Sequence, residues 1–164
     1  MTAPTKFQMD VALHVVKYLK GTDTKGLFYA ADNTFDLQAY CDSDWGSCKL
    51  TRRSVTGYCV FLGPSLILWK SKKQNTVNRS SAEAKYRAMA TTSCELKWLA
   101  YLLDEFQIKL PLPIPLFCDN QAAIHIAANP VFHERMKHVN IDCHIIREHL
   151  VSGFISTPYI SSDS

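Results

Sequence analysis

Apolar residues along this chain recur with two different periods, one typical of helices and the other of strands. Residues 7–20 repeat apolar side chains at helical spacing and stop at Gly21, which predicts an amphipathic helix. Residues 80–107 carry the longest stripe of this kind, from Ala82 to Leu103, and predict the main helix of the molecule. Shorter helices are predicted over residues 120–128 and 133–150.

Alternating apolar and polar side chains mark the predicted strands. Residues 35–42 alternate without a break, so Gln38, Tyr40 and Asp42 share one face of their strand. Apolar runs bounded by turn residues predict further strands at residues 27–30, 54–62, 66–70, 116–118 and 153–160. Consecutive strands followed by helical crossovers are typical of a mixed α/β sheet covered by helices, which is the predicted fold class.

Three acidic residues stand where such a fold can hold them rigidly. Asp42 ends the alternating strand, Asp119 ends the run 115–119, and Glu83 lies in the first turn of the main helix. Asp42 and Asp119 meet if their strands lie side by side, with Glu83 approaching from the helix above. Carboxylate oxygens in fixed geometry are ligands for hard cations such as Mg²⁺, so the pattern indicates a nuclease-type metal site. Asp44, on the same strand face as Asp42, is a secondary candidate.

Two of these acids also have a structural interpretation. The sequence Ser80-Ser81-Ala82-Glu83 fits a capping box, in which the glutamate accepts a hydrogen bond from the backbone N–H of Ser80. Asp119 has the residue type and position of an N-cap for the helix that follows it.

Length and composition describe a single domain with a core. The chain has 164 residues, of which 47% are hydrophobic and 20% are charged, enough for one domain to bury a core. Trp69 and Trp98 are expected to pack in this core or half-buried at its edge. No apolar run approaches the ~18–20 residues that cross a bilayer, and residues 1–6 lack an apolar signal region, so we expect a soluble intracellular protein. Six cysteines without a Cys-x-x-Cys pair fit a reducing compartment rather than a disulfide framework.

The net charge of +3 is mild, but its distribution is uneven. No acidic residue occurs between Asp44 and Glu83, whereas seven basic residues do, and we call them the basic belt: Lys49, Arg52, Arg53, Lys70, Lys72, Lys73 and Arg79. A solvated basic surface is the plain alternative. A basic belt flanked by candidate metal ligands is more specific, and it favours nucleic acid as the partner.

Five short blocks follow one another along the chain: YCDSDWG at 40–46, TRRSVTGY at 51–58, SSAEAKY at 80–86, CDNQAA at 118–123 and HERMKH at 133–138. Together they resemble the ribonuclease H domain of copia-type (Pseudoviridae-like) LTR retrotransposon polyproteins, and the resemblance covers nearly the whole chain. Residues 1–30 look like the connection segment that follows reverse transcriptase in those polyproteins. Residues 31–164 are then the expected ribonuclease H-like domain.

The resemblance implies a ribonuclease H fold, with a mixed five-stranded sheet flanked by helices, that cleaves the RNA strand of RNA–DNA hybrids. Two Mg²⁺ ions, for which Mn²⁺ can substitute, would be bridged by Asp42 and completed by Glu83 and Asp119. The family's fourth acid lies at the start of a helix after the last strand. The chain stops at Ser164, so we expect a domain truncated before that helix, with Asp142 as the in-chain substitute.

The resemblance also assigns substrate contacts by position. Polar residues just ahead of the glutamate and just after the aspartate fall where the family's fold touches the hybrid, and they are Asn78, Arg79, Ser80, Asn120 and Gln121. Polar side chains of this kind reach 2′-hydroxyls and the minor groove. Arg52 and Arg53 are expected to contact phosphates, which position the hybrid without reading its sequence.

The expected partners are an RNA–DNA hybrid and the reverse transcriptase domain of the same polyprotein, without a membrane. The expected location is the cytoplasm, within retrotransposon virus-like particles. The alternative function is a catalytically silent module that binds the hybrid or supports the polymerase domain, which the basic belt would serve equally well. A DNA-cutting integrase or resolvase can share this fold, but the blocks at 40–46 and 51–58 do not match those proteins.

Overall fold

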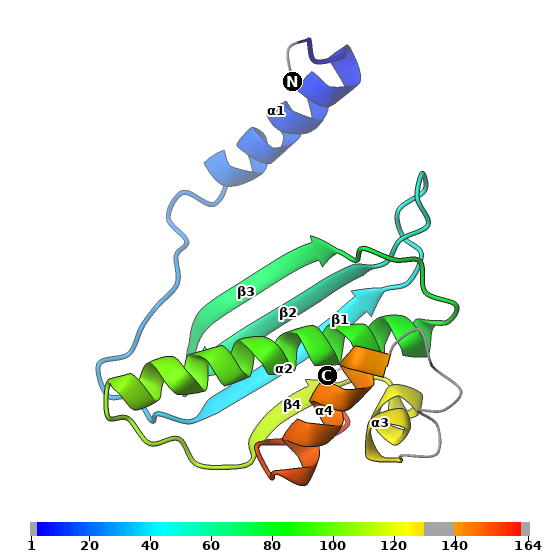
Figure 1. Cartoon of the computed structure of the whole chain (residues 1–164). Coiled ribbons are helices and arrows are strands. Elements are labelled where there is room, and N and C mark those ends of the chain that lie inside the picture. The colour runs from blue at the N-terminus through cyan, green and yellow to red at the C-terminus, as the bar shows by residue number, and fades with distance from the viewer. Residues whose placement is uncertain (1–2, 130–139, 162–164) are drawn as a thin grey trace.

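The computed structural model describes residues 3–129 and 140–161. In chain order the elements are α1 (Lys6–Lys20), β1 (Leu37–Asp44), β2 (Val55–Leu62), β3 (Ser65–Lys73), α2 (Ser81–Glu105), β4 (Ile114–Cys118), α3 (Gln121–Ala128), α4 (Asn140–Val151) and β5 (Ile155–Ser156) (Figure 1). Most of them lie where the sequence predicts them. Of the predicted helix 133–150, residues 133–139 lie outside the described residues.

The strands form one mixed five-stranded sheet in the order β3-β2-β1-β4-β5, which confirms the predicted fold class (Figure 1). β1 pairs antiparallel with β2, and β2 with β3 across the predicted hairpin. β1 pairs parallel with β4, in a register that sets Ala39 opposite Leu116 and Cys41 opposite Cys118. The C-terminal ends of β1 and β4 therefore lie side by side.

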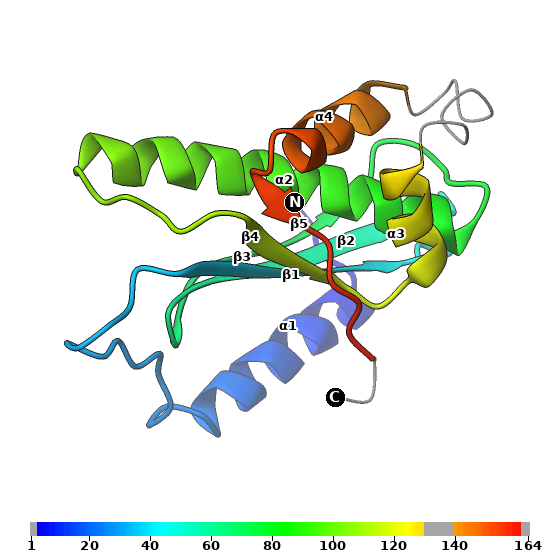
Figure 2. The same cartoon turned by 90° about the horizontal axis from the view of Figure 1, so that it is seen from below.

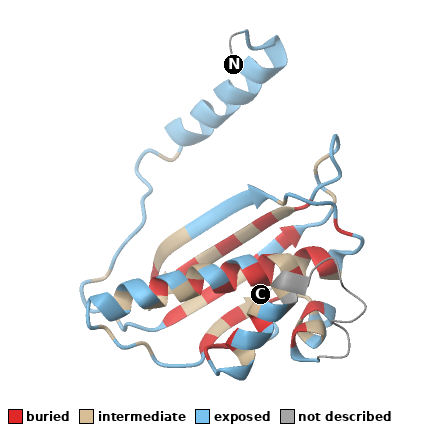
Figure 3. Ribbon diagram, viewed as in Figure 1, coloured by how far each residue is buried: buried red, intermediate tan, exposed pale blue. Residues whose placement is uncertain are grey.

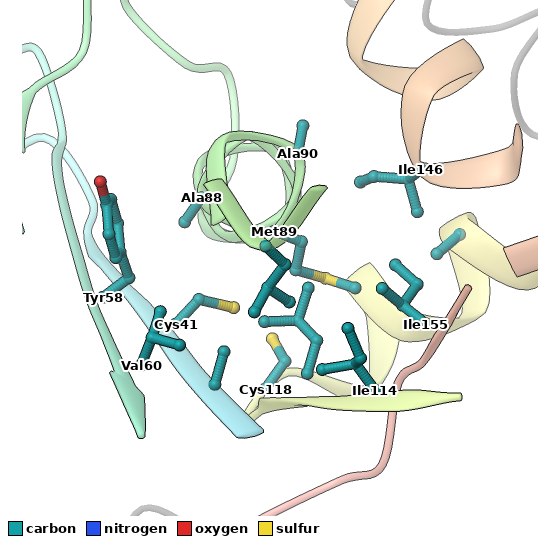
Figure 4. Packing of buried hydrophobic residues seen from close by; sticks show 14 of the residues in the cluster. Cys41, Tyr58, Val60, Ala88, Met89, Ala90, Ile114, Cys118, Ile146 and Ile155 are labelled. Carbon is teal, nitrogen blue, oxygen red and sulfur yellow. The ribbon is translucent and has the colours of Figure 1, made fainter. Parts of the chain in front are cut away.

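Helix α2 covers one face of the sheet, and α3 and α4 lie on the same side (Figure 2). The side chain of Ser80, its N-cap, accepts a hydrogen bond from the backbone N–H of Glu83. Tyr86 and Met89 are fully buried, and Figure 4 shows Met89 pointing from α2 into the cluster that holds Cys118. Burial of such side chains, at roughly 25 cal/mol per Å² of apolar surface, fixes the rotation of α2 about its axis against the sheet.

The other face of the sheet carries aromatic side chains that remain partly exposed. Tyr40 stacks on Phe117 with ring centroids 4.8 Å apart and meets Phe61 edge-on at 5.9 Å. Trp69 on β3 is 59% exposed and Trp98 on α2 is 56% exposed, so the expectation that they pack in the core or half-buried at its edge is wrong. The period of a strand or helix does not tell which face a neighbour covers, and both tryptophans lie on faces left open.

Helix α1 stands apart from the sheet and has no buried residue (Figures 1 and 3). Its start is fixed locally, because Thr5 and Gln8 form a capping box. Residues 27–30, predicted as a strand, adopt no strand geometry and lie in the stretch between α1 and β1. The domain boundary placed at residue 30 falls in this stretch and stays a prediction.

Each of the described helices is too short or too polar to span a bilayer.

Candidate active site

The parallel pairing of β1 with β4 brings Asp42 and Asp119 together. Cys41 and Cys118 are partners in the sheet, and each aspartate is the next residue along the chain. Both residues line a hollow of about 500 Å³ on the partly exposed face of the sheet, beside Tyr40 and Phe117. The strands are neighbours as the sequence predicts, so the two carboxylates share one site.

Lys85 of α2 occupies the position between these carboxylates. Its Nζ lies 2.5 Å from Oδ1 of Asp42 and 2.5 Å from Oδ1 of Asp119, and its side chain is 13% exposed. Burial by itself lowers the pKa of Lys85. The hydrogen bonds that it donates to Asp119 and Asp42, with their charges, outweigh burial, so its pKa is raised above the ordinary lysine value and the ammonium is charged.

Glu83 is turned away from this pair. Residues two apart on a helix are about 200° apart around its axis, so Glu83 and Lys85 face nearly opposite directions. The Glu83 carboxylate is buried and accepts from the backbone N–H of Arg79 at 2.8 Å and from Nη2 of Arg87 at 3.3 Å. Arg87 in turn lies 3.5 Å from Oδ2 of Asp142, whose pKa is raised by burial although the Arg87 charge opposes the shift.

The capping interpretations of the acids are each partly or wholly wrong. Ser80 caps α2 as predicted, but the Glu83 carboxylate bonds the N–H of Arg79 instead of that of Ser80. The N-cap of α3 is Asn120, whose Oδ1 accepts from the backbone N–H of Ala123 at 2.8 Å, so Asp119 does not cap that helix. Asp119 is thereby left facing Asp42 and Lys85.

The site therefore unites two of the three proposed ligands. Within residues 3–129 and 140–161, no group of three or more His, Cys, Asp or Glu side chains is placed to hold a metal ion. The pair itself fits a divalent cation, because one oxygen from Asp42 and one from Asp119 already meet at a single positive charge. Mg²⁺ sites commonly use one or two carboxylates, with water and substrate phosphates completing the octahedron. Asp44 is exposed at the end of β1.

The predicted substrate contacts divide into exposed and buried side chains. Arg52, Arg53, Arg79 and Gln121 are exposed, and Ser80 and Asn120 act as helix N-caps. Asn78 is 4% exposed. Its Nδ2 donates to Oγ of Ser54 at 2.9 Å and to Oε1 of Gln74, so it holds the loop before α2 in place.

The sequence pattern singled out neither Lys85, which lies in the site, nor Gln74, which holds the start of α2 against the sheet. Gln74 donates from Nε2 to Oγ1 of Thr56 at 2.8 Å and to the backbone carbonyl of Ala84 at 3.0 Å, which ties β2 to the start of α2. Lys85 had a signal in the sequence. It lies four residues before the apolar Met89 and so on the side of α2 that packs on the sheet, whereas Glu83, which is also buried, lies four residues before Arg87 on another side of the helix.

The basic belt follows β3 and the loops at the same end of the sheet as the pair. Its lysines and arginines are exposed or at the margin of a groove of about 300 Å³ between β3 and α2, which Lys70, Lys72 and Lys73 line. Glu95 of α2 accepts from the hydroxyl of Tyr58 at 2.8 Å and pairs with Lys70 at 3.5 Å. Exposed positive charges arranged in this way attract and bind a polyanion such as a nucleic acid.

No family model matches this chain. It is similar to the retrovirus-related Pol polyproteins from transposon RE1 of Arabidopsis thaliana, at 44% identity over 162 residues, and from transposon TNT 1-94 of Nicotiana tabacum, at 32% over 145 residues. The alignments cover 99% and 88% of this chain but 11% of each polyprotein, so the chain spans about a tenth of these relatives' length.

Among solved structures, the N-terminal RNase H domain of a Mycobacterium tuberculosis protein, fused to maltose-binding protein, is similar with a TM-score of 0.54. The two chains are 11% identical, and the match covers 79% of this chain and 85% of the other, which shows the fold. The chain thus belongs to the copia-type transposon Pol polyproteins as a segment of them, and its sheet and helices form a ribonuclease H-like domain.

Proposed function

We propose that this chain is an endoribonuclease that binds RNA–DNA hybrids and cleaves the RNA strand during reverse transcription, with Mg²⁺ or Mn²⁺ as cofactor. The observation that carries the proposal is that Asp42 and Asp119, from neighbouring parallel strands, both contact one positive charge, the ammonium of Lys85. The likeness to Pol polyproteins and the ribonuclease H-like fold support this class of reaction.

Asp42 and Asp119 would each hold the metal through a carboxylate oxygen, at the edge of the hollow on the sheet face. When bound, divalent ions supply a hydroxide-like nucleophile and stabilise the leaving 3′ oxygen of a phosphodiester, in the two-metal form with one ion for each task. Glu83 is proposed as the third ligand from the family resemblance. It joins the pair only after its carboxylate leaves Arg87 and the N–H of Arg79.

The exposed arginines would hold the hybrid by its phosphates. Arg52, Arg53 and Arg79 offer planar guanidinium groups, which bind phosphate oxygens in pairs. Gln121, exposed at the start of α3 one residue from the Asn120 cap, is placed to reach the minor groove. The reverse transcriptase region of the same polyprotein is the proposed neighbour, inside the retrotransposon particle.

A second candidate, the catalytically silent hybrid-binding module, is favoured by one observation. The position between the two aspartates is filled by Lys85, while Glu83 is bonded to arginine on the other side of α2. A domain arranged in this way can bind hybrid through its basic belt without holding metal.

Cleavage of a labelled RNA–DNA hybrid in Mg²⁺ and in Mn²⁺ tests the proposal. Single-stranded RNA, duplex RNA and duplex DNA are the comparison substrates. We expect hybrid-specific cleavage that Asp42→Asn and Asp119→Asn each reduce by roughly 100-fold or more, because each removes a charged metal ligand. The matched control is Asp32→Asn, which removes the same charge from an exposed residue ahead of β1 and should cleave like the wild type.

Hybrid binding is measured beside cleavage, by fluorescence anisotropy with and without metal. Binding that needs no metal and is unchanged in Asp42→Asn, with no cleavage in either metal, would replace the enzyme by the silent module. Equal cleavage of duplex DNA or duplex RNA would contradict the assignment of the hybrid as substrate.

A further inference from the structure

Lys85 places a positive charge in the centre of the candidate metal site. Its Nζ contacts one oxygen of each aspartate at 2.5 Å, and its side chain is 13% exposed, less than that of either partner. An ammonium has three donors and one charge, so it satisfies the facing oxygens and neutralises half of the charge of the pair. This is the electrostatic task that a bound metal ion would otherwise perform.

We propose that Lys85 is an internal cation of this site, and that a divalent metal binds between Asp42 and Asp119 only when the ammonium moves out. The inference rests on the proposed metal-dependent function and deepens it. According to this proposal, the side chain at position 85 of α2 sets the affinity of the site for a divalent metal ion.

The backbone explains why this position faces the pair. The rotation of α2 about its axis is fixed by its buried side chains, among them Met89, which lies four residues and so about 40° around the helix from Lys85. Glu83 is on the far side and is anchored by Arg79 and Arg87. A side chain at position 85 therefore meets the strand ends whatever its chemistry, and a carboxylate there would be a third acid.

The same geometry gives the ammonium a way out. Asp42 is 70% exposed, and the hollow beside the pair opens to solvent along the sheet face. The four-carbon stem of a lysine is flexible, so Nζ can leave both oxygens without any movement of the helix. The backbone that carries the two aspartates stays fixed by the pairing of β1 with β4.

The test is direct binding of Mn²⁺ to the whole chain without nucleic acid, followed by electron paramagnetic resonance of the free ion. Lys85→Met removes the charge and keeps the length of the side chain, and it should lower the Kd for Mn²⁺ by about tenfold or more, equivalent to about 1.4 kcal/mol. Lys85→Glu should bind more tightly still. Lys85→Arg keeps the charge and should bind as weakly as the wild type.

Three controls locate the effect. Lys109→Met removes an equal charge from an exposed position between α2 and β4 and should leave the Kd unchanged. Asp119→Asn added to Lys85→Met should abolish the gain, since it removes half of the site. Thermal melts establish that each variant is folded. An unchanged Kd in folded Lys85→Met, or an equal gain in Lys109→Met, overturns the inference.

A measurement on the wild type does not depend on any variant. Amine labelling followed by mass spectrometry should modify Lys85 slowly without metal and several-fold faster in saturating Mg²⁺, while the labelling of exposed Lys109 stays constant. Constant labelling of Lys85 while Mg²⁺ binds would show that the metal sits elsewhere, and it overturns the proposal.

The outcomes separate this inference from the proposed function. Tighter Mn²⁺ binding by Lys85→Met, with no cleavage of hybrid by any variant, supports the internal cation and contradicts the enzyme. Hybrid cleavage by the wild type, with equal Mn²⁺ affinity in the wild type and Lys85→Met, supports the enzyme and contradicts the internal cation.

Discussion

At the scale of single residues, Cys48 shows how a loop can alter the chemistry of one side chain. Hydrogen bonds from the side chain and backbone of Thr51, and one from Nζ of Lys73 at 3.3 Å, lower the pKa of Cys48 to about 6. We expect its alkylation by iodoacetamide to rise with a midpoint near pH 6 and to level off above it, because the thiolate is the nucleophile.

Mass spectrometry of the labelled chain checks this, with Cys94 as the internal comparison. Cys94 is exposed, yet partial burial raises the pKa of its thiol, so its labelling should still be increasing at pH 9. Lys73→Met should move the Cys48 midpoint upward. A midpoint at the ordinary thiol value of 9.0 for Cys48 would contradict the assignment.

The candidate site was predictable from the sequence only as far as strand ends carry it. Asp42 and Asp119 each close an apolar run, so the local pattern places both at strand ends, and the parallel pairing of the two strands then brings them together. The choice between positions 83 and 85 depends on the rotation of α2 about its axis, which is set by its packing on the sheet. Both positions lie on buried sides of α2: Glu83 faces Arg87, whereas Lys85, four residues before the buried Met89, faces the strand ends, and the role of Glu83 as a metal ligand stays a prediction. The buried state of Asn78 was likewise invisible before the fold was known.

At the scale of elements, the β2–β3 hairpin depends on one glycine. Gly63 has φ +54°, and a methyl group there would come within 1.9 Å of Oδ1 of Asn33 and 2.7 Å of the carbonyl oxygen of Thr34. We expect Gly63→Ala to lower the free energy of unfolding by about 1–3 kcal/mol, from backbone strain together with the clash. Urea denaturation measures this.

Gly57 of β2 supplies the matched control for the hairpin. It has no heavy atom within 4 Å of the corresponding position, and its φ lies outside the left-handed range. Gly57→Ala should therefore change the free energy of unfolding by less than about 1 kcal/mol, in either direction. A similar loss in both variants would mean that the hairpin is not specifically sensitive at Gly63.

Elements with strong local signals were predicted, and those that depend on a distant partner were not. The alternation of residues 35–42 and the stripe of 80–107 gave β1 and α2 to within a few residues. Residues 27–30 are apolar enough for a strand but have no neighbouring strand to pair with in the described part of the chain. The predicted strand 153–160 shrinks to β5 at Ile155–Ser156 and an isolated bridge at Tyr159, because Pro158 between them has no N–H to donate.

At the scale of the whole molecule, the arrangement of charge should be visible in the salt dependence of hybrid binding. Replacing both Arg52 and Arg53 with glutamine should weaken binding at low salt and reduce the slope of log K against log salt by about 1–2, because each phosphate contact releases counterions. Lys17→Gln with Lys20→Gln removes the same charge from α1, which stands apart from the sheet, and should leave the slope unchanged. Equal effects of the two double variants would assign binding to net charge instead of the basic belt.

The pairing of β1 with β4 has a consequence for how this domain is made and lost. Between Asp42 and Asp119 the chain passes through β2, β3 and the whole of α2, so a ribosome completes that crossover before the partner of Asp42 exists. Translation of the first half alone yields one aspartate without its mate. A gene copy with a stop or a frameshift anywhere between the two codons therefore encodes Asp42 without Asp119, and so it does not form the pair.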